Sequence, residues 1–90
     1  MFKAITGTVT GRVQGVGFRY FAQMEAEKLN LAGWVKNVED DIVEFFAQGD
    51  ESDLDIFLAR IESGPPMARV DKLLKRETIT NDKLKYFVIT

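Results

Sequence analysis

The first part of the chain alternates between apolar and polar positions. Within Lys3–Val13, isoleucine, valine and glycine occupy the odd positions from 5 onward, and threonine or arginine the even positions from 6 onward. Such an alternation gives the two faces of an extended chain different side chains and predicts a β-strand. Two shorter apolar stretches, Gly33–Val38 and Ile42–Ala47, flank the polar run Glu39-Asp40-Asp41, which predicts a hairpin.

In two other segments the apolar residues recur every three or four positions, a spacing that lines one face of an α-helix. In Phe18–Leu29 this face consists of Phe18, Ala22, Ala26 and Leu29. Asn30 then tolerates the left-handed conformation that commonly ends a helix. A second helix is predicted to start with Ser52 as N-cap and Asp55 three residues later, similar to a capping box, and to stop at Gly64. Its apolar face consists of Leu54, Phe57, Leu58 and Ile61.

Two further strands are predicted, over Ala68–Thr78 and Lys83–Ile89. The element order is then β-α-β-β-α-β with a short extra C-terminal strand. This order predicts an α+β, ferredoxin-like sandwich: a mainly antiparallel sheet with two helices on one face. Residues 1–90 are expected to form a single domain. Trp34, Phe45, Phe46, Phe57 and Phe87 are expected in or near the core.

Composition excludes several classes of function. Cysteine is absent and no signal peptide or long apolar run occurs, which favours a cytoplasmic protein without a membrane span. The net charge of −2 argues against nonspecific binding to nucleic acid. Histidine is also absent, so any catalysis proceeds without the commonest general base and the commonest neutral metal ligand.

The segment Gln14–Gly17 joins the first strand to a helix and has the properties of a phosphate-binding loop. Glycines let backbone N–H groups face a ligand closely, and a helix N-terminus carries partial positive charge. Arg19 adds a planar, charged guanidinium that is suited to binding phosphate. No Ser, Thr, Asp or Asn caps this helix, so its first N–H groups are left open to an anion. The first acidic residue of the helix is Glu25, so no acid neutralises Arg19 in the first turn.

Glycine spacing alone favours an ordinary tight connection with Arg19 on the surface. The missing cap, the missing acid and the apolar residues Val13, Val16 and Phe18 around the loop shift the interpretation towards phosphate binding. Three other kinds of phosphate-binding loop are excluded. The segment lacks the Lys-Ser/Thr of a P-loop, it has Tyr20 where a dinucleotide fingerprint needs its third glycine, and the chain has no cysteine for a cysteine phosphatase.

The run VTGRVQGVGFR at Val9–Arg19 resembles the signature of the acylphosphatases. GWVKN at Gly33–Asn37 is similar to their second motif, and GPPMARV at Gly64–Val70 to the segment after their second helix. The resemblance implies an intracellular monomer that hydrolyses acyl phosphates without cofactor or metal. It further implies that Arg19 is the catalytic phosphate-binding arginine and Asn37 orients the attacking water. The implied backbone cradle is Gln14, Gly15, Val16, Gly17 and Phe18, up to Arg19.

Two features depart from the family pattern. Asp40-Asp41 stands where the family usually has Asp-Gly, and the chain ends Phe87–Thr90 without the usual arginine and aromatic residue. Because neither change lies at Arg19, Asn37 or the loop, both are expected to affect stability more than the reaction. The acidic residues around this turn are expected to be solvated rather than to bind metal.

Two other interpretations remain open. One is an RNA-binding module on the same fold, for which the aromatic residues Phe18, Tyr20 and Phe21 beside Arg19 are the main argument. Their place in a helix and the negative net charge count against it. The other is a catalytically idle phosphate- or carbamoyl-phosphate-binding domain, as found in a larger hydrogenase-maturation protein. The start at Met1 and the length of 90 residues favour a stand-alone enzyme.

Overall fold

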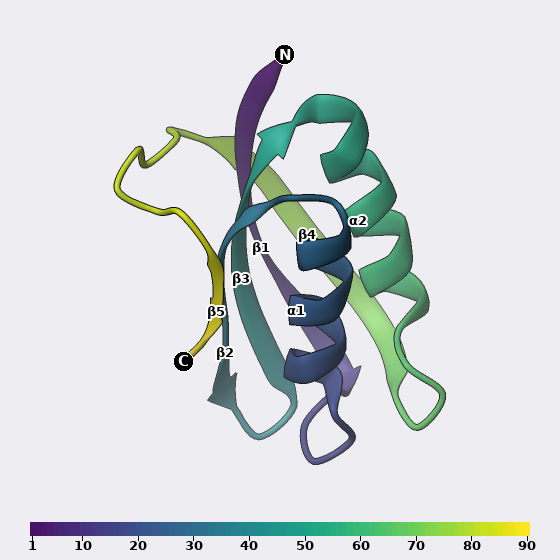
Figure 1. Ribbon diagram of the computed structural model, residues 1–90. Coiled ribbons are helices and arrows are strands. Elements are labelled where there is room, and N and C mark those ends of the chain that lie inside the picture. Colours follow the sequence, from purple (N-terminus) through teal and green to yellow (C-terminus); the bar gives the residue numbers. More distant parts are fainter.

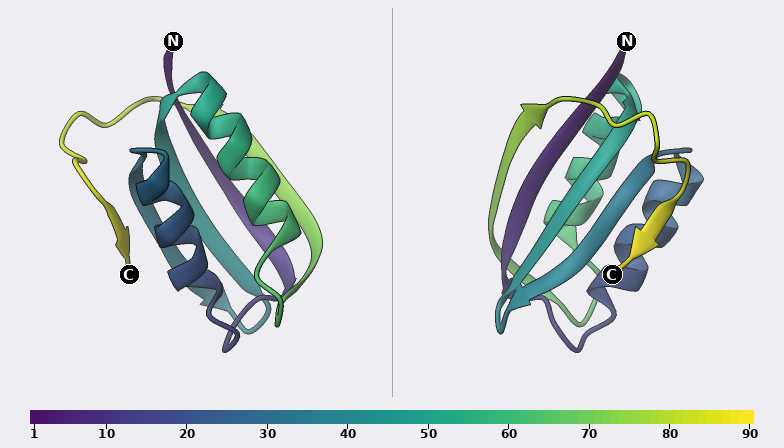
Figure 2. Two further views of the ribbon diagram at one scale, coloured as in Figure 1. Left: turned by 45° about the vertical axis from the view of Figure 1, so that its right-hand side comes forward. Right: turned by 90° about the vertical axis from the view of Figure 1, so that its left-hand side faces the viewer.

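The computed structural model describes residues 1–90 and contains the predicted elements in the predicted order. They are β1 (Phe2–Arg12), α1 (Phe18–Lys28), β2 (Ala32–Glu39), β3 (Ile42–Asp50), α2 (Glu51–Ser63), β4 (Arg69–Thr78) and β5 (Phe87–Ile89). The strands form one sheet in the order β4-β1-β3-β2-β5. All neighbouring strands are antiparallel except β2 and β5, which are parallel. Both helices cover the same face of the sheet (Figures 1 and 2), so the ferredoxin-like prediction is confirmed.

The core lies between the helices and this face of the sheet. Phe45 of β3 and Phe87 of β5 each pack edge-on against Phe57 of α2, with ring centroids 6.0 and 5.8 Å apart. Trp34 and Phe46, also expected in or near the core, are half-buried residues paired across β2 and β3. Because side chains alternate along a strand, they lie on the opposite face, where their rings stack at 6.3 Å.

Two predicted element boundaries are wrong. The N-cap of α2 is Asp50 rather than Ser52, because the Asp50 carboxylate accepts hydrogen bonds from both the backbone N–H and the hydroxyl of Ser52. The same carboxylate binds the N-terminal ammonium of Met1 at 3.0 Å, a contact that no local pattern encodes. The last strand covers only Phe87–Ile89 instead of Lys83–Ile89.

Removing the Asp50 carboxylate is expected to destabilise the protein at neutral pH but not in acid. Hydrogen bonds from Ser52 and then the terminal ammonium hold the pKa of Asp50 below its ordinary value. A lowered folded-state pKa contributes stability above the unfolded-state pKa of about 3.9, and this contribution is lost as the pH falls through the folded-state value. Thermal unfolding of Asp50→Ala and wild type at about pH 7 and about pH 2 measures the effect.

The difference in unfolding midpoint between these two proteins is expected to shrink on acidification. Asp82→Ala, in an exposed turn, is the control and should unfold like wild type at both pH values. A midpoint difference for Asp50→Ala that stays constant from neutral pH to acid contradicts the assignment.

The elements that meet at one end of the molecule position the functional site. The segment between β1 and α1 lies beside the β2–β3 turn (Figure 1), and the backbone N–H of Gly11 donates to the carbonyl oxygen of Asp41 at 3.0 Å. Asn30, with a φ of 57°, ends α1 in the predicted left-handed conformation. Neither helix has the length and apolar character needed to span a bilayer.

Candidate active site

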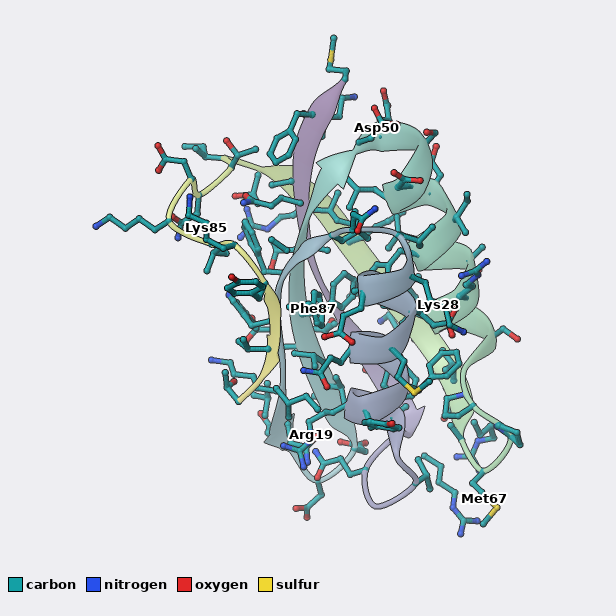
Figure 3. All side chains as sticks on the ribbon, viewed as in Figure 1. Arg19, Lys28, Asp50, Met67, Lys85 and Phe87 are labelled. Carbon is teal, nitrogen blue, oxygen red and sulfur yellow. The ribbon has the colours of Figure 1, made fainter.

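A cleft of about 200 Å³ opens where the β1–α1 loop meets the end of the sheet. It brings together Arg19 and Asn37, which are 18 positions apart in the sequence, with most of the glycine loop. Figure 3 shows Arg19 at the start of α1, close to the end of β5. The residues lining the cleft are Val13, Gln14, Gly15, Gly17, Phe18, Arg19, Tyr20, Asn37 and Ile89.

The loop presents its backbone N–H groups without using them inside the protein. Gly15 and Gly17 have φ values of 72° and 77°, which side-chain-bearing residues rarely adopt. Gly17 is the N-cap of α1 and provides no side-chain cap, and the first turn of the helix contains no acid. From Gln14 to Arg19, no backbone N–H donates to a protein acceptor. These donors and the positive end of the helix dipole form a site for an anion.

Arg19 is half-buried, and its guanidinium makes no salt bridge with an aspartate or glutamate. Its Nη1 donates to the main-chain oxygen of Thr90 at 3.1 Å, and the backbone N–H of Thr90 donates to the carbonyl oxygen of Val35 at 2.9 Å. A single hydrogen bond orients the guanidinium while leaving its other donors for a ligand. The premise that the changed chain end does not touch Arg19 is therefore wrong, because Thr90 follows β5, which pairs in parallel with β2.

Asn37 lies on β2 opposite Val43 of β3 and is exposed. The register of the two strands shifts directly after it, between Asn37 and Glu39. Such a bulge turns the strand and redirects the neighbouring side chains. The alternation of the strand places Asn37 on the same side of the sheet as the buried Val35, and there it lines the cleft together with the loop.

The β2–β3 turn accommodates Asp40 and Asp41 without backbone strain. Neither has a positive φ, since Asn30 is the only residue other than glycine that does. The register of the two strands shifts beside the turn, between Asn37 and Glu39. The acidic residues of this turn belong to no group of three or more potential metal ligands.

The structure brings together most, but not all, of the predicted site residues. Gln14, Gly15, Gly17 and Phe18 line the cleft. Val16 belongs to the same loop but does not line the cleft, because its side chain packs against the core. Three further residues line the cleft without having been predicted as site residues: Val13 after β1, Tyr20 on α1 and Ile89 on β5. Tyr20 follows Arg19 directly in the sequence, and this neighbourhood is the one local indication that Tyr20 lies near the site. Nothing in the local sequence pointed to Ile89.

Comparison with known proteins identifies the family. The family model described as acylphosphatase matches residues 5–89. The chain belongs to the acylphosphatase family. An acylphosphatase from Bacillus licheniformis is 49% identical over 82 residues, which cover 91% of each chain. The crystal structure of the acylphosphatase from Bacillus subtilis covers 100% of this chain and 99% of its own, with a TM-score of 0.92 and 43% identity.

Membership of this family establishes the activity. The protein is a hydrolase that cleaves the carboxyl–phosphate anhydride of acyl phosphates to carboxylate and inorganic phosphate. The fold also recurs inside a larger protein: full-length HypF contains a segment with a TM-score of 0.89 and 32% identity that covers this whole chain but 12% of its own. The relatives of comparable length carry the name acylphosphatase, which favours the enzyme over an idle binding domain.

Proposed function

We propose that this acylphosphatase binds the phosphoryl group of its substrate at the N-terminus of α1, with Arg19 as phosphate ligand and Asn37 as the residue that holds the attacking water. The observation that carries the proposal is the run of backbone N–H groups from Gln14 to Arg19 without protein acceptors, in a cleft that Asn37 also lines. Gln14, Gly15, Val16, Gly17 and Phe18 supply the cradle with Arg19.

This arrangement suits the charge changes of phosphoryl transfer. The attacking water forms a bond to phosphorus while the bond between phosphorus and the acyl oxygen breaks, and the carboxylate departs with the bonding electrons. Positioning and electrostatic stabilisation of the phosphoryl oxygens account for most of such catalysis, and fixed amides with a guanidinium supply both. The amide of Asn37 is too weak a base to remove the proton of the water. The proton therefore passes to a phosphoryl oxygen.

The lining of the cleft also limits the substrate class. It contains no aspartate, glutamate, histidine or cysteine that would protonate a leaving group, and Tyr20 is its only side chain with a hydroxyl. A phenol is a much weaker acid than a carboxylic acid or an imidazolium. A carboxylate leaves without protonation, whereas an alkoxide does not. The cleft therefore favours acyl phosphates over alkyl phosphate monoesters.

Phosphate release from acetyl phosphate and from glycerol phosphate in excess chelator tests this proposal. Rapid hydrolysis of acetyl phosphate, with competitive inhibition by inorganic phosphate and no measurable turnover of glycerol phosphate, is the expected result. Activity that is lost in chelator and restored by a divalent cation would contradict metal-independent catalysis. Comparable rates with both substrates would show that an unrecognised acid protonates the leaving group.

We further propose that residues 1–90 act as a single-domain monomer in the cytoplasm. The absence of cysteine supports the cytoplasm, because small secreted domains commonly rely on disulfides. The cleft is built within one chain and needs no second copy to complete it. Light scattering at assay concentration tests the oligomeric state.

A further inference from the structure

The side chain of Gln14 spans two parts of the active site. Its backbone belongs to the loop, but its amide leaves the loop and reaches the β2–β3 hairpin. Nε2 donates to the carbonyl oxygen of Ile42 at 3.0 Å and also to that of Glu39. These two residues form the last pair of the hairpin, on either side of the turn. The amide thus closes the end of the hairpin onto the loop.

The part of the hairpin held in this way carries Asn37. Glu39 lies two residues after Asn37, on the far side of the bulge that shifts the register. A bulged strand end has fewer ladder hydrogen bonds and deforms more readily than a regular one. The backbone bond from Gly11 to Asp41 fixes the tip of the turn, but only the Gln14 amide joins the loop itself to the strand ends beside Asn37.

We propose that the Gln14 side chain is a positioning residue that sets the place of Asn37 relative to the phosphate-binding loop. The role rests on the proposed function of Asn37 in holding the water. In-line attack depends steeply on alignment, and displacements of about 1 Å lower rates by about 100-fold in unfavourable cases. A tether between the group that holds phosphate and the group that holds water controls that alignment.

The tether should affect turnover and not phosphate binding. The loop conformation is set by Gly15 and Gly17, and the guanidinium of Arg19 is held by Thr90, so both persist without the Gln14 amide. Loss of the tether frees the hairpin end while the phosphate site stays intact. A residue that only stabilised the fold would instead lower the unfolding midpoint and leave kcat unchanged.

Gln14→Met tests the role, because methionine has a similar length but no donor. We expect kcat for acetyl phosphate to fall about 10-fold, with the inhibition constant of inorganic phosphate within about twofold of wild type. Gln48→Met is the matched control. The amide of Gln48 also makes two hydrogen bonds to backbone, both to Asn81 at 2.8 Å, at a site outside the cleft. This variant is expected to lose stability and keep kcat.

A double-mutant cycle with Asn37→Ala then decides how Gln14 acts. If the tether works through Asn37, Gln14→Met should lower kcat in the wild-type background and change it by less than about twofold when Asn37 is already alanine. Equal losses in both backgrounds, or an unchanged kcat for Gln14→Met in wild type, overturn the proposal. Gln14→Ala provides the same comparison should the methionine variant not fold.

The cycle also separates the two hypotheses. An unchanged kcat for Asn37→Ala alone would overturn the proposed role of Asn37, and the tether would then have no residue to position. A large loss for Asn37→Ala together with additive effects of Gln14→Met would leave the role of Asn37 standing and remove only the tether.

Discussion

Replacing Arg19 by alanine is expected to lower kcat/KM for acetyl phosphate by about 10³-fold or more while the protein stays folded. The guanidinium is the only charged side chain that lines the cleft, and it makes no salt bridge with an aspartate or glutamate. Its removal takes a permanent positive charge from the phosphoryl oxygens in both the bound and the transition state. The inhibition constant of inorganic phosphate should therefore rise together with the loss in turnover.

Two other substitutions make this experiment specific. Arg19→Lys keeps the charge but not the planar fork, so its activity should lie between those of wild type and Arg19→Ala. Arg76→Ala removes an exposed arginine that makes no ion pair and lies outside the cleft, and should leave turnover and phosphate inhibition unchanged. Activity of Arg19→Ala within about tenfold of wild type would contradict the proposed mechanism.

Replacing Asn37 by alanine is expected to lower kcat by about 10² to 10³-fold, the range found when one fixed polar group is removed from a reacting centre. Asn37 lines the cleft from β2 and is not part of the loop that supplies the proposed cradle, so the inhibition constant of inorganic phosphate should remain near that of wild type. Initial rates over a range of acetyl phosphate concentrations, with phosphate as inhibitor, give both quantities from one preparation.

The neighbouring Lys36 is the control for this variant. It pairs with Glu44 on the face of the sheet away from the helices, where its Nζ lies 5.2 Å from the centre of the Trp34 ring. Lys36→Ala therefore changes the same strand without reaching the cleft and should retain its kcat. Loss of phosphate affinity in Asn37→Ala equal to its loss of turnover would show that Asn37 binds phosphate instead of water.

The sequence alone determined the fold class and the centre of the site. The alternation over β1 and the three-to-four spacing of apolar residues in both helices follow from local strand and helix geometry. These patterns therefore predicted the strand and the two helices without a structure. The glycine loop without a capping residue was equally readable, because an uncapped helix N-terminus is a property of a few consecutive residues. The roles of Arg19 and Asn37 were predicted from a family resemblance. Local spacing does not show that a helix residue and a strand residue line the same cleft.

Tertiary structure decided the contacts that connect distant segments. Parallel pairing of β5 with β2 brings Thr90 to Arg19 across 71 positions of sequence, and the amide of Gln14 reaches a hairpin 25 to 28 residues away. The carboxylate of Asp50, which caps α2 through local hydrogen bonds from Ser52, also binds the ammonium of the chain's first residue, 49 positions away. These contacts depend on how the strands are ordered in the sheet. Hydrophobic periodicity specifies which face of each helix or strand is buried. It does not specify which strands become neighbours in the sheet, and so it does not predict which distant segments come into contact.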